Sequence, residues 1–304
     1  MGGFCFVILH YQTLNDTVDC VSSILSTIKE ADYRIIIVDN GSPNKSGNTL
    51  MDLYEGNPVV KVIISSKNLG FTSGNNIGFQ YAKREFRSDF IALINNDTIL
   101  EQPDFINIIK EKFIETHFDI LGPDIYTPDG KHQSPAFNKM SSLPVLERYI
   151  RFYNKILLLN YLGLDSIAER IKKHFIPASS LHVEDIHSLP DRTKEQTGVM
   201  LHGSALLFSA KYIDRYDGLY SGPFMYGEEA ILDFIARRDN LVVIYSPDVR
   251  IVHRDDSATN SVYKKPLLKR RFYLKNFLRS SRILKRLMEE QKATEQIKLT
   301  DKMK

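Results

Sequence analysis

The sequence lacks the features of a disulfide-stabilised, secreted or membrane-spanning protein. It has two cysteines, Cys5 and Cys20, in 304 residues, too few for a disulfide framework and typical of a reducing compartment. The longest apolar stretch, residues 156–164, is interrupted by Asn160 and is far shorter than the roughly 20 residues of a membrane-spanning helix. The N-terminus has neither a basic region nor a small-residue cleavage site, so no secretory signal is expected. We therefore expect a cytoplasmic protein.

A large net charge of one sign is also absent. The 40 Lys and Arg residues nearly balance the 37 Asp and Glu residues, which leaves a formal charge of +3. This balance is unlike that of a wholly cationic nucleic-acid binder, so nucleic acid is not an expected partner. With 43% hydrophobic residues, the chain has enough apolar surface to fold, as one large domain or two modest ones.

Short β-branched runs alternate with helical patterns over the first hundred residues. The expected strands cover residues 4–10, 34–38, 59–64 and 90–94, and the expected helices cover 15–29 and 76–84. Continuous apolar runs separated by helices are typical of buried parallel strands joined by crossovers. The sequence therefore predicts an α/β fold with an open, mostly parallel sheet, whose ligands bind beyond the carboxyl ends of the strands.

The regular pattern is interrupted between residues 138 and 197. Helical segments are expected at 145–164 and 166–175, followed by a polar loop, and we interpret the whole stretch as an insertion or lid. Regular elements return with a strand at 202–208, a helix from Tyr226 to Arg238, and strands at 241–245 and 249–253.

Three polar clusters follow strands of the predicted sheet and should meet at one rim. They are Asp39-Asn40-Gly41-Ser42, the segment from Asn68 to Gly78, and Asn95-Asn96-Asp97. Asp39 can accept a hydrogen bond from a nucleotide base, although D-N-G-S by itself is also typical of an Asx turn or a helix N-cap. Glycines at 70, 74 and 78 either let backbone N–H groups approach a phosphate or form a flexible turn. Asp97 suits Mg²⁺, which takes one or two carboxylates and completes its shell from substrate phosphates.

Two further groups carry chemistry at expected element ends. Glu228 and Glu229 follow a glycine at a helix start, where they either stabilise the helix dipole or provide a general base for a hydroxyl group. His253 ends a strand and is either a metal ligand or a structural residue. No histidine pair or cysteine partner indicates a structural zinc site.

The order of these segments resembles bacterial glycosyltransferase family 2, especially its rhamnosyltransferase-like and galactofuranosyltransferase-like branch. The matching motifs are V-D-N-G-S, N-L-G-F-T-S-G-N-N-I-G-F, L-I-N-N-D-T, H-G-S-A-L-L-F-S, F-M-Y-G-E-E and I-V-H. The resemblance spans residues 4–260 apart from the insertion. It implies a GT-A fold, a metal-dependent enzyme with a nucleotide-activated sugar donor, and inversion at the anomeric carbon.

The resemblance also assigns roles to individual residues. The implied nucleotide-sugar site consists of Asp39, Asn40, Asn68, Gly70, Asn75, Asn76, Asn95 and Asn96. The implied ligands of Mg²⁺ or Mn²⁺ are Asp97 and His253, and the implied catalytic base is Glu229 or alternatively Glu228. The implied acceptor site consists of His202, Gly203, Phe224 and Tyr226. With no tryptophan in the chain, Tyr or Phe must stack on the sugar face. Two positions depart from the family pattern, which has Asp where this chain has Glu229 and often another Asp where it has Ile231.

The donor implied first is dTDP-L-rhamnose, followed by a UDP-hexose or UDP-galactofuranose. The implied acceptor is a saccharide, expected to be lipid-linked, in capsule, O-antigen or cell-wall polysaccharide synthesis. Asn95, which replaces the first Asp of the family's D-x-D motif, and the altered positions 229 and 231 keep open a catalytically impaired scaffold that binds the nucleotide-sugar. A nucleotidyltransferase is disfavoured because residues 4–15 lack a glycine-rich phosphate signature. A homo-oligomer is compatible with the sequence.

Residues 261–304 form an expected basic, amphipathic, helical extension to a catalytic domain at 1–260. Between Lys264 and Arg286 there are ten basic residues and no acid, so the remainder has 40 − 10 = 30 basic against 37 acidic residues. The rest of the chain is thus acidic, although the total is nearly neutral. Such a helix either binds an anionic membrane surface at the inner face of the cell membrane or packs on the protein.

Overall fold

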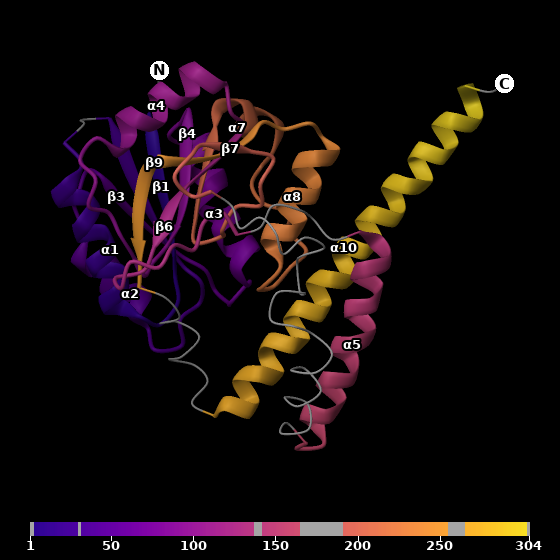
Figure 1. Cartoon of the computed structure of the whole chain (residues 1–304). Helices are drawn as coiled ribbons and strands as arrows, with labels where there is room; N and C mark the ends of the chain where they lie inside the picture. Colours follow the sequence, from indigo (N-terminus) through magenta and orange to yellow (C-terminus); the bar gives the residue numbers. More distant parts are fainter. Residues whose placement is uncertain (1–2, 30–31, 137–141, 165–190, 255–264, 303–304) are drawn as a thin grey trace.

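The computed structural model describes residues 3–29, 32–136, 142–164, 191–254 and 265–302 (Figure 1). Its strands are β1 (Phe4–His10), β2 (Tyr33–Asp39), β3 (Val60–Ile64), β4 (Phe90–Asn95), β5 (Thr98–Ile99), β6 (Ile120–Tyr126), β7 (Gln196–Thr197), β8 (Ala205–Ser209) and β9 (Val243–His253). Its helices are α1 (Leu14–Thr27), α2 (Ser46–Leu53), α3 (Phe71–Arg84), α4 (Phe105–Thr116), α5 (Leu143–Tyr161), α7 (Ala210–Arg215), α8 (Glu228–Arg238) and α10 (Pro266–Lys302).

The strands form one mixed sheet in the order β3-β2-β1-β4-β8-β6-β9-β5, with β7 paired to β9. β1 pairs in parallel with both β2 and β4, and β2 pairs in parallel with β3. This half confirms the predicted parallel sheet. β8 is antiparallel to β4 and β6, which makes the second half mixed. β9 is one strand where the sequence predicted two, because a register shift against β6 between Pro123 and Asp124 absorbs the irregular residues.

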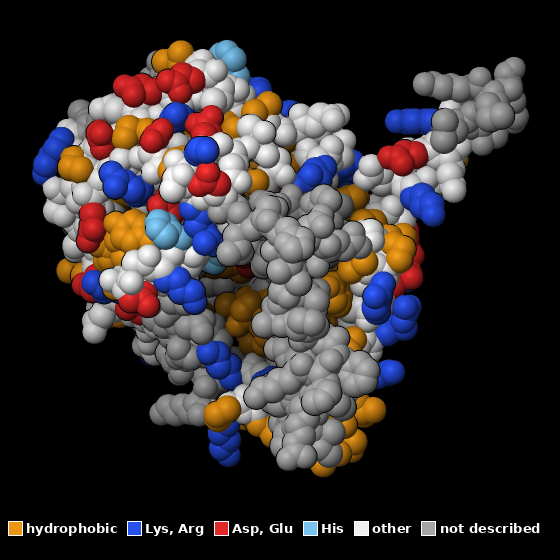
Figure 2. Space-filling view, viewed as in Figure 1, with side chains coloured by type: hydrophobic (Ala, Val, Ile, Leu, Met, Phe, Trp, Pro, Cys, Tyr) orange, Lys and Arg blue, Asp and Glu red, His pale blue; other side chains and the backbone are white. Residues whose placement is uncertain are grey.

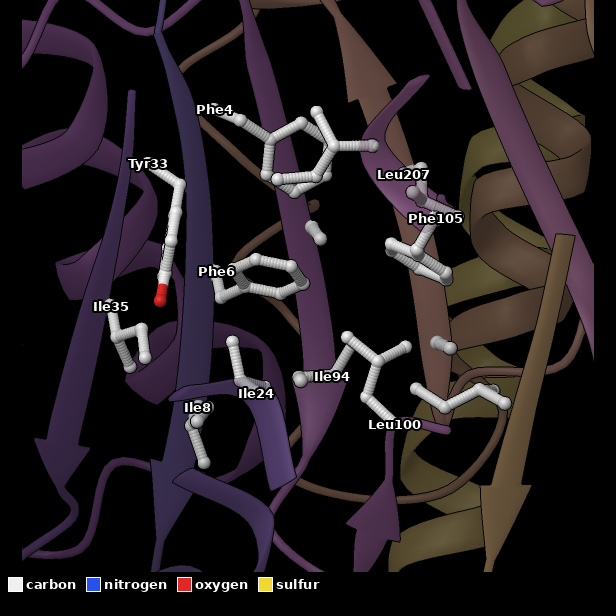
Figure 3. Close-up of a cluster of buried hydrophobic side chains, with 14 of the residues drawn as sticks. Phe4, Phe6, Ile8, Ile24, Tyr33, Ile35, Ile94, Leu100, Phe105 and Leu207 are labelled. Atoms are coloured by element: carbon white, nitrogen blue, oxygen red, sulfur yellow. The ribbon is translucent and has the colours of Figure 1, made fainter. Parts of the chain in front are cut away.

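The core lies on both faces of the sheet because side chains alternate along buried strands. In β1, Phe4, Phe6 and Ile8 enter one cluster together with residues of α1 and α4, such as Ile24 and Phe105 (Figure 3). The intervening Cys5 and Val7 enter the opposite cluster with Phe79 of α3 and Tyr212 of α7. Both cysteines are free and buried. The two apolar clusters pack on opposite faces of β1, β2 and β4, whose carboxyl ends lie at one edge of the sheet.

The predicted insertion and the C-terminal extension pack against each other. α5 and the first half of α10 lie side by side, while the end of α10 projects from the body (Figure 1). The apolar residues Leu274, Leu278, Leu284 and Leu287 of α10 are buried at 1–6% exposure, against α5 and α8. Of the two alternatives for this helix, packing on the protein accounts for these four leucines, while membrane binding by the extension stays a prediction.

Parts of these predictions lie outside the described residues. They are the expected helix 166–175 and its polar loop, Lys264, and the proposed boundary near residue 260. Within the described residues, no helix is long and apolar enough to cross a bilayer.

Candidate functional site

The loops after β2 and β3 meet directly at the carboxyl edge of the sheet. The Asn40 side-chain Nδ2 donates to Asn68 Oδ1 and to the Gly70 carbonyl, each at 3.1 Å. The Leu69 N–H donates to Asn40 Oδ1 at 2.9 Å. Both ends of the Asn40 amide are thus engaged by the protein, so this residue positions the Asn68–Gly70 loop.

Asp39 is buried at the end of β2 with its carboxylate at this rim. It accepts hydrogen bonds from the Ser42 N–H at 3.3 and 3.4 Å, which is the Asx turn that the sequence allowed. Gly47 in α2 lies so close that a Cβ at this position would overlap the Asp39 carboxylate. The glycine therefore lets the first turn of α2 approach Asp39.

A buried polar chain connects Asp39 to the third cluster. Asn96 Nδ2 donates to Thr17 Oγ1 at 2.9 Å, Thr17 Oγ1 lies 2.7 Å from His10 Nδ1, and His10 Nε2 lies 2.7 Å from Ser46 Oγ. His10 Nε2 is also 4.0 Å from Asp39. Burial lowers the pKa of His10 to about 4, against the opposing effect of Asp39, so the imidazole is neutral at ordinary pH. His10 was not among the predicted site residues, although it ends β1 at the same edge.

Asn75 and Asn76 lie in α3, not in the expected loop, because the helix begins at Phe71. Gly70, with φ of 81°, precedes the first turn, and the Phe71 N–H donates to the Phe224 carbonyl at 2.6 Å. Asn76 Nδ2 donates to the Leu219 carbonyl at 2.7 Å, and the Leu219 N–H donates to Asn76 Oδ1 at 2.7 Å. Asn76 therefore holds the loop before α8 against α3, and Asn75 donates to the Phe71 carbonyl at 3.1 Å.

Gly74 and Gly78 serve helix packing rather than a flexible turn. A Cβ on Gly74 would meet a Leu9 methyl at 2.7 Å, and one on Gly78 would overlap Val7. Both glycines allow α3 to lie close to the sheet.

The predicted metal ligands Asp97 and His253 come together from the ends of β4 and β9. His253 Nε2 lies 3.2 Å from Asp97 Oδ1, and both residues are buried. Gln133 Oε1 lies 2.8 Å from His253 Nδ1 and orients the ring so that Nε2 faces the carboxylate. One carboxylate and one oriented imidazole fit a divalent cation that takes its other ligands from phosphate and water. Within the described part of the chain, no group of three or more His, Cys, Asp or Glu could hold a metal alone.

His202 and Gly203 connect this pair to the candidate base. The His202 and His253 rings are 5.9 Å apart, and the Asn95 N–H donates to the Ser204 carbonyl at 2.8 Å. A Cβ on Gly203 would lie 2.8 Å from Glu229 Oε1. The absence of a side chain at 203 thus makes room for the Glu229 carboxylate.

The adjacent carboxylates of Glu228 and Glu229 occupy different environments at the start of α8. Burial, followed by the charge of Glu229, raises the pKa of Glu228 well above its usual value. Glu228 Oε2 is buried without a hydrogen-bond partner within the described residues. The Glu229 carboxylate lies beside Gly203, next to the contact between the His202 and His253 rings, so Glu229 is the better placed candidate base.

α10 adds aromatic rings to the predicted acceptor residues. The Phe224 and Phe272 rings are 6.3 Å apart, and the Tyr226 and Tyr273 rings are 4.9 Å apart. Burial raises the pKa of Tyr273, with smaller contributions from Tyr226 and Glu229. The sequence did not predict that Phe272 and Tyr273 lie beside the acceptor residues, because these contacts join residues about fifty positions apart.

Comparison with known proteins connects this geometry to a family. The hexosyltransferase Agl10 of low-salt glycan biosynthesis in Haloferax volcanii is 22% identical over 291 residues, which cover 91% of this chain and 76% of Agl10. A Mycobacterium tuberculosis protein whose name places it among glycosyltransferases is 32% identical over 90 residues, 30% of this chain and 25% of that protein.

The crystal structure of S. aureus TarS has a TM-score of 0.50 and 12% identity, covering 83% of this chain and 36% of TarS. This likeness concerns the fold, and it agrees with the predicted GT-A architecture. The chain thus spans only part of TarS and of the M. tuberculosis protein. The sequence model of Glycosyl transferase family 2 matches residues 5–166, more than half of the chain. The protein therefore belongs to glycosyl transferase family 2.

Proposed function

We propose that this protein transfers a sugar from a nucleoside diphosphate donor to a saccharide hydroxyl, with inversion at the anomeric carbon. The main support is the continuous arrangement of Asp97, His253, His202, Gly203 and Glu229 at one edge of the sheet. This arrangement puts a candidate diphosphate site beside a candidate base, as an in-line displacement requires.

In this mechanism, Glu229 accepts the proton of the acceptor hydroxyl while that oxygen attacks the anomeric carbon. Asp39 and the Asn68–Gly70 loop would hold the nucleotide, and Asn95 and Asn96 would lie near the sugar and diphosphate. Asp97 and His253 would bind Mg²⁺ or Mn²⁺, which supplies positive charge for the departing diphosphate. The raised pKa of the buried Glu228 reduces the tendency of this carboxyl group to ionise beside Glu229.

Glu229→Gln tests the assignment of the base. The amide keeps the shape of the side chain but cannot take a proton, so transfer should fall by about 10²-fold or more. Donor binding, measured by calorimetry, should change little. The matched change Glu228→Gln should leave much of the activity, because the proposed proton acceptor is the neighbouring Glu229. Full turnover by Glu229→Gln would exclude Glu229 as the base.

For the donor, we propose dTDP-L-rhamnose first and a UDP-hexose or UDP-galactofuranose next. The similarity to a hexosyltransferase of glycan biosynthesis over 91% of the chain favours a hexose-type donor. The acceptor would be a lipid-linked saccharide of a surface polysaccharide. Phe224 and Tyr226, with Phe272 and Tyr273, would form an aromatic wall for its sugar rings.

A non-catalytic scaffold that binds the nucleotide-sugar is the second candidate. Glu229 is one methylene longer than the family aspartate, and Ile231 is buried at 1% exposure where the family often has an acid. Donor binding without transfer to a range of synthetic lipid-linked saccharides would favour the scaffold over the enzyme.

A further inference from the structure

One end of the α5–α10 pair exposes an unusual group of apolar side chains. The exposed fractions are 60% for Leu158, 50% for Tyr161, 62% for Leu162, 37% for Leu267 and 42% for Leu268. We call these five residues the helical tip. Hydrophobic side chains gather at this lower end of the pair in Figure 2. Single exposed leucines are ordinary, whereas a group of them marks an interaction surface.

Among the described residues of α5 and α10 near the helical tip, the charged side chains are all basic. Neither residues 148–164 nor residues 265–288 include an acid. Lys155 and Lys265 are exposed, and Lys269 and Arg270 are partly exposed. A second copy of the same basic surface would repel it, whereas an anionic surface would attract it.

The two helix ends are held together, so the tip is a defined surface. Arg271 Nε donates to Asn160 Oδ1 at 2.8 Å, and its guanidinium lies 4.2 Å from the centre of the Tyr161 ring. Asn160 Nδ2 in turn donates to the Leu267 carbonyl at 3.3 Å. The leucines farther along α10 are buried in the protein, so within the described residues the exposed leucines of this helix are those at its beginning.

We propose that the helical tip docks on the surface of an anionic lipid bilayer. The leucines and Tyr161 enter the headgroup region, and the surrounding lysines approach the lipid phosphates. The strand β9, which ends at His253, points toward the side of the molecule where this tip lies (Figure 1). A docked tip would therefore turn the carboxyl edge of the sheet toward a lipid-linked acceptor. This orientation rests on the proposed function, whereas the docking itself does not.

Co-sedimentation of the full chain with vesicles tests the docking. Vesicles of phosphatidylcholine mixed with phosphatidylglycerol should bind the protein, and phosphatidylcholine alone should bind it far less. Leu162→Ser combined with Leu267→Ser should weaken binding by about ten-fold or more. The matched control is Leu53→Ser combined with Ile114→Ser, which replaces residues 54% and 58% exposed on α2 and α4. Equal binding by the tip variant, or equal binding to both vesicle types, would overturn the proposal.

A fluorescent label gives a second measurement, which detects vesicle binding directly and does not depend on a variant that weakens it. Leu162→Cys can be labelled selectively because Cys5 and Cys20 are buried. An environment-sensitive dye at 162 should shift to the blue with anionic vesicles, while the same dye on Ile114→Cys should not. No shift at 162, or a lipid-free dimer that the tip variant abolishes, would refute membrane docking. Donor binding measured without lipid tests the proposed function separately.

Discussion

At the residue scale, the contact between Asp97 and His253 has the most direct chemical consequence. Gln133, in the segment after β6, contacts His253 Nδ1 and orients the imidazole ring. Nε2 offers a lone pair to the site only in the tautomer that carries its proton on Nδ1. In the proposed function, a cation held by these two residues would take further ligands from the donor phosphates. Metal and nucleotide should consequently bind together.

Asp97→Ala should remove the tightening of nucleotide binding by Mn²⁺, because the only carboxylate facing His253 in the described structure is lost. Calorimetry of UDP and dTDP binding, with and without Mn²⁺, measures this effect. Asp52→Ala, an exposed carboxylate on α2, is the control and should keep the tightening. Unchanged metal dependence in Asp97→Ala would remove the assigned role.

His10 should make the stability of the fold sensitive to acid. Its pKa is about 4 in the folded chain, below the usual 6.5, so the unfolded chain binds more protons between these values. Stability from the neutral imidazole is present above about pH 6.5 and decreases as the pH falls toward 4, by up to ~3 kcal/mol. Urea unfolding at several pH values should show a shallower dependence for His10→Asn than for the parent. An identical pH dependence of the unfolding free energy in the two proteins would show that His10 does not cause the acid sensitivity.

At the scale of elements, α10 is a packed part of the molecule as well as a basic helix. Its leucines are buried against α5 and α8, Lys285 lies 3.0 Å from Glu147, and Ser280 lies against Gly227. The helix thereby supports the start of α8, where the candidate base lies.

Leu278→Ala should lower the free energy of unfolding by about 2–5 kcal/mol, because it leaves a cavity between α10 and α5. Ile297→Ala, at a position 63% exposed on the projecting end of α10, should have almost no effect. Chemical denaturation of the full chain provides both values. A small effect at Leu278 would mean that α10 contributes little to the fold.

Tyr273→Ala should raise the KM for the acceptor several-fold while donor affinity stays constant, because it removes one ring of the proposed aromatic wall. Tyr273→Phe keeps the ring and should restore much of the affinity. Leu278→Ala weakens the packing of α10 on α5 without removing an aromatic ring. It therefore separates the effect of the ring from that of weaker helix packing. An unchanged acceptor KM in Tyr273→Ala would exclude the ring from the acceptor site.

At the scale of the whole molecule, a bound donor should stabilise the fold. A ligand that binds only the folded state adds about 2.7 kcal/mol at a hundred times its Kd. The correct nucleotide-sugar with Mn²⁺ should therefore raise Tm by several degrees more than the free sugar. A thermal-shift screen of dTDP- and UDP-sugars measures this and ranks the donors. No stabilisation by any nucleotide-sugar would contradict the proposed function.

The parallel half of the sheet was predictable because its information is local. The run from Phe4 to His10 gave a strand with the observed bounds, and parallel pairing placed the polar clusters after β2, β3 and β4 at one edge. The elements α2, α4 and β6 were not predicted, because their sequence patterns are short or interrupted by charged residues. The role of Asp97 and His253 was inferred from family resemblance, and their proximity is a structural finding.

By itself, the sequence determined the strand pattern, the family motifs and the uneven distribution of charge, since each depends on residues close together in the chain. Only the tertiary structure decided that α3 begins at Phe71 and that α10 packs on α5. Phe71 donates to a carbonyl of Phe224, and Arg271 bonds to Asn160; both contacts join residues more than a hundred positions apart. No local pattern encodes such pairs, because these contacts form and stabilise the structure only when folding has brought the distant residues together.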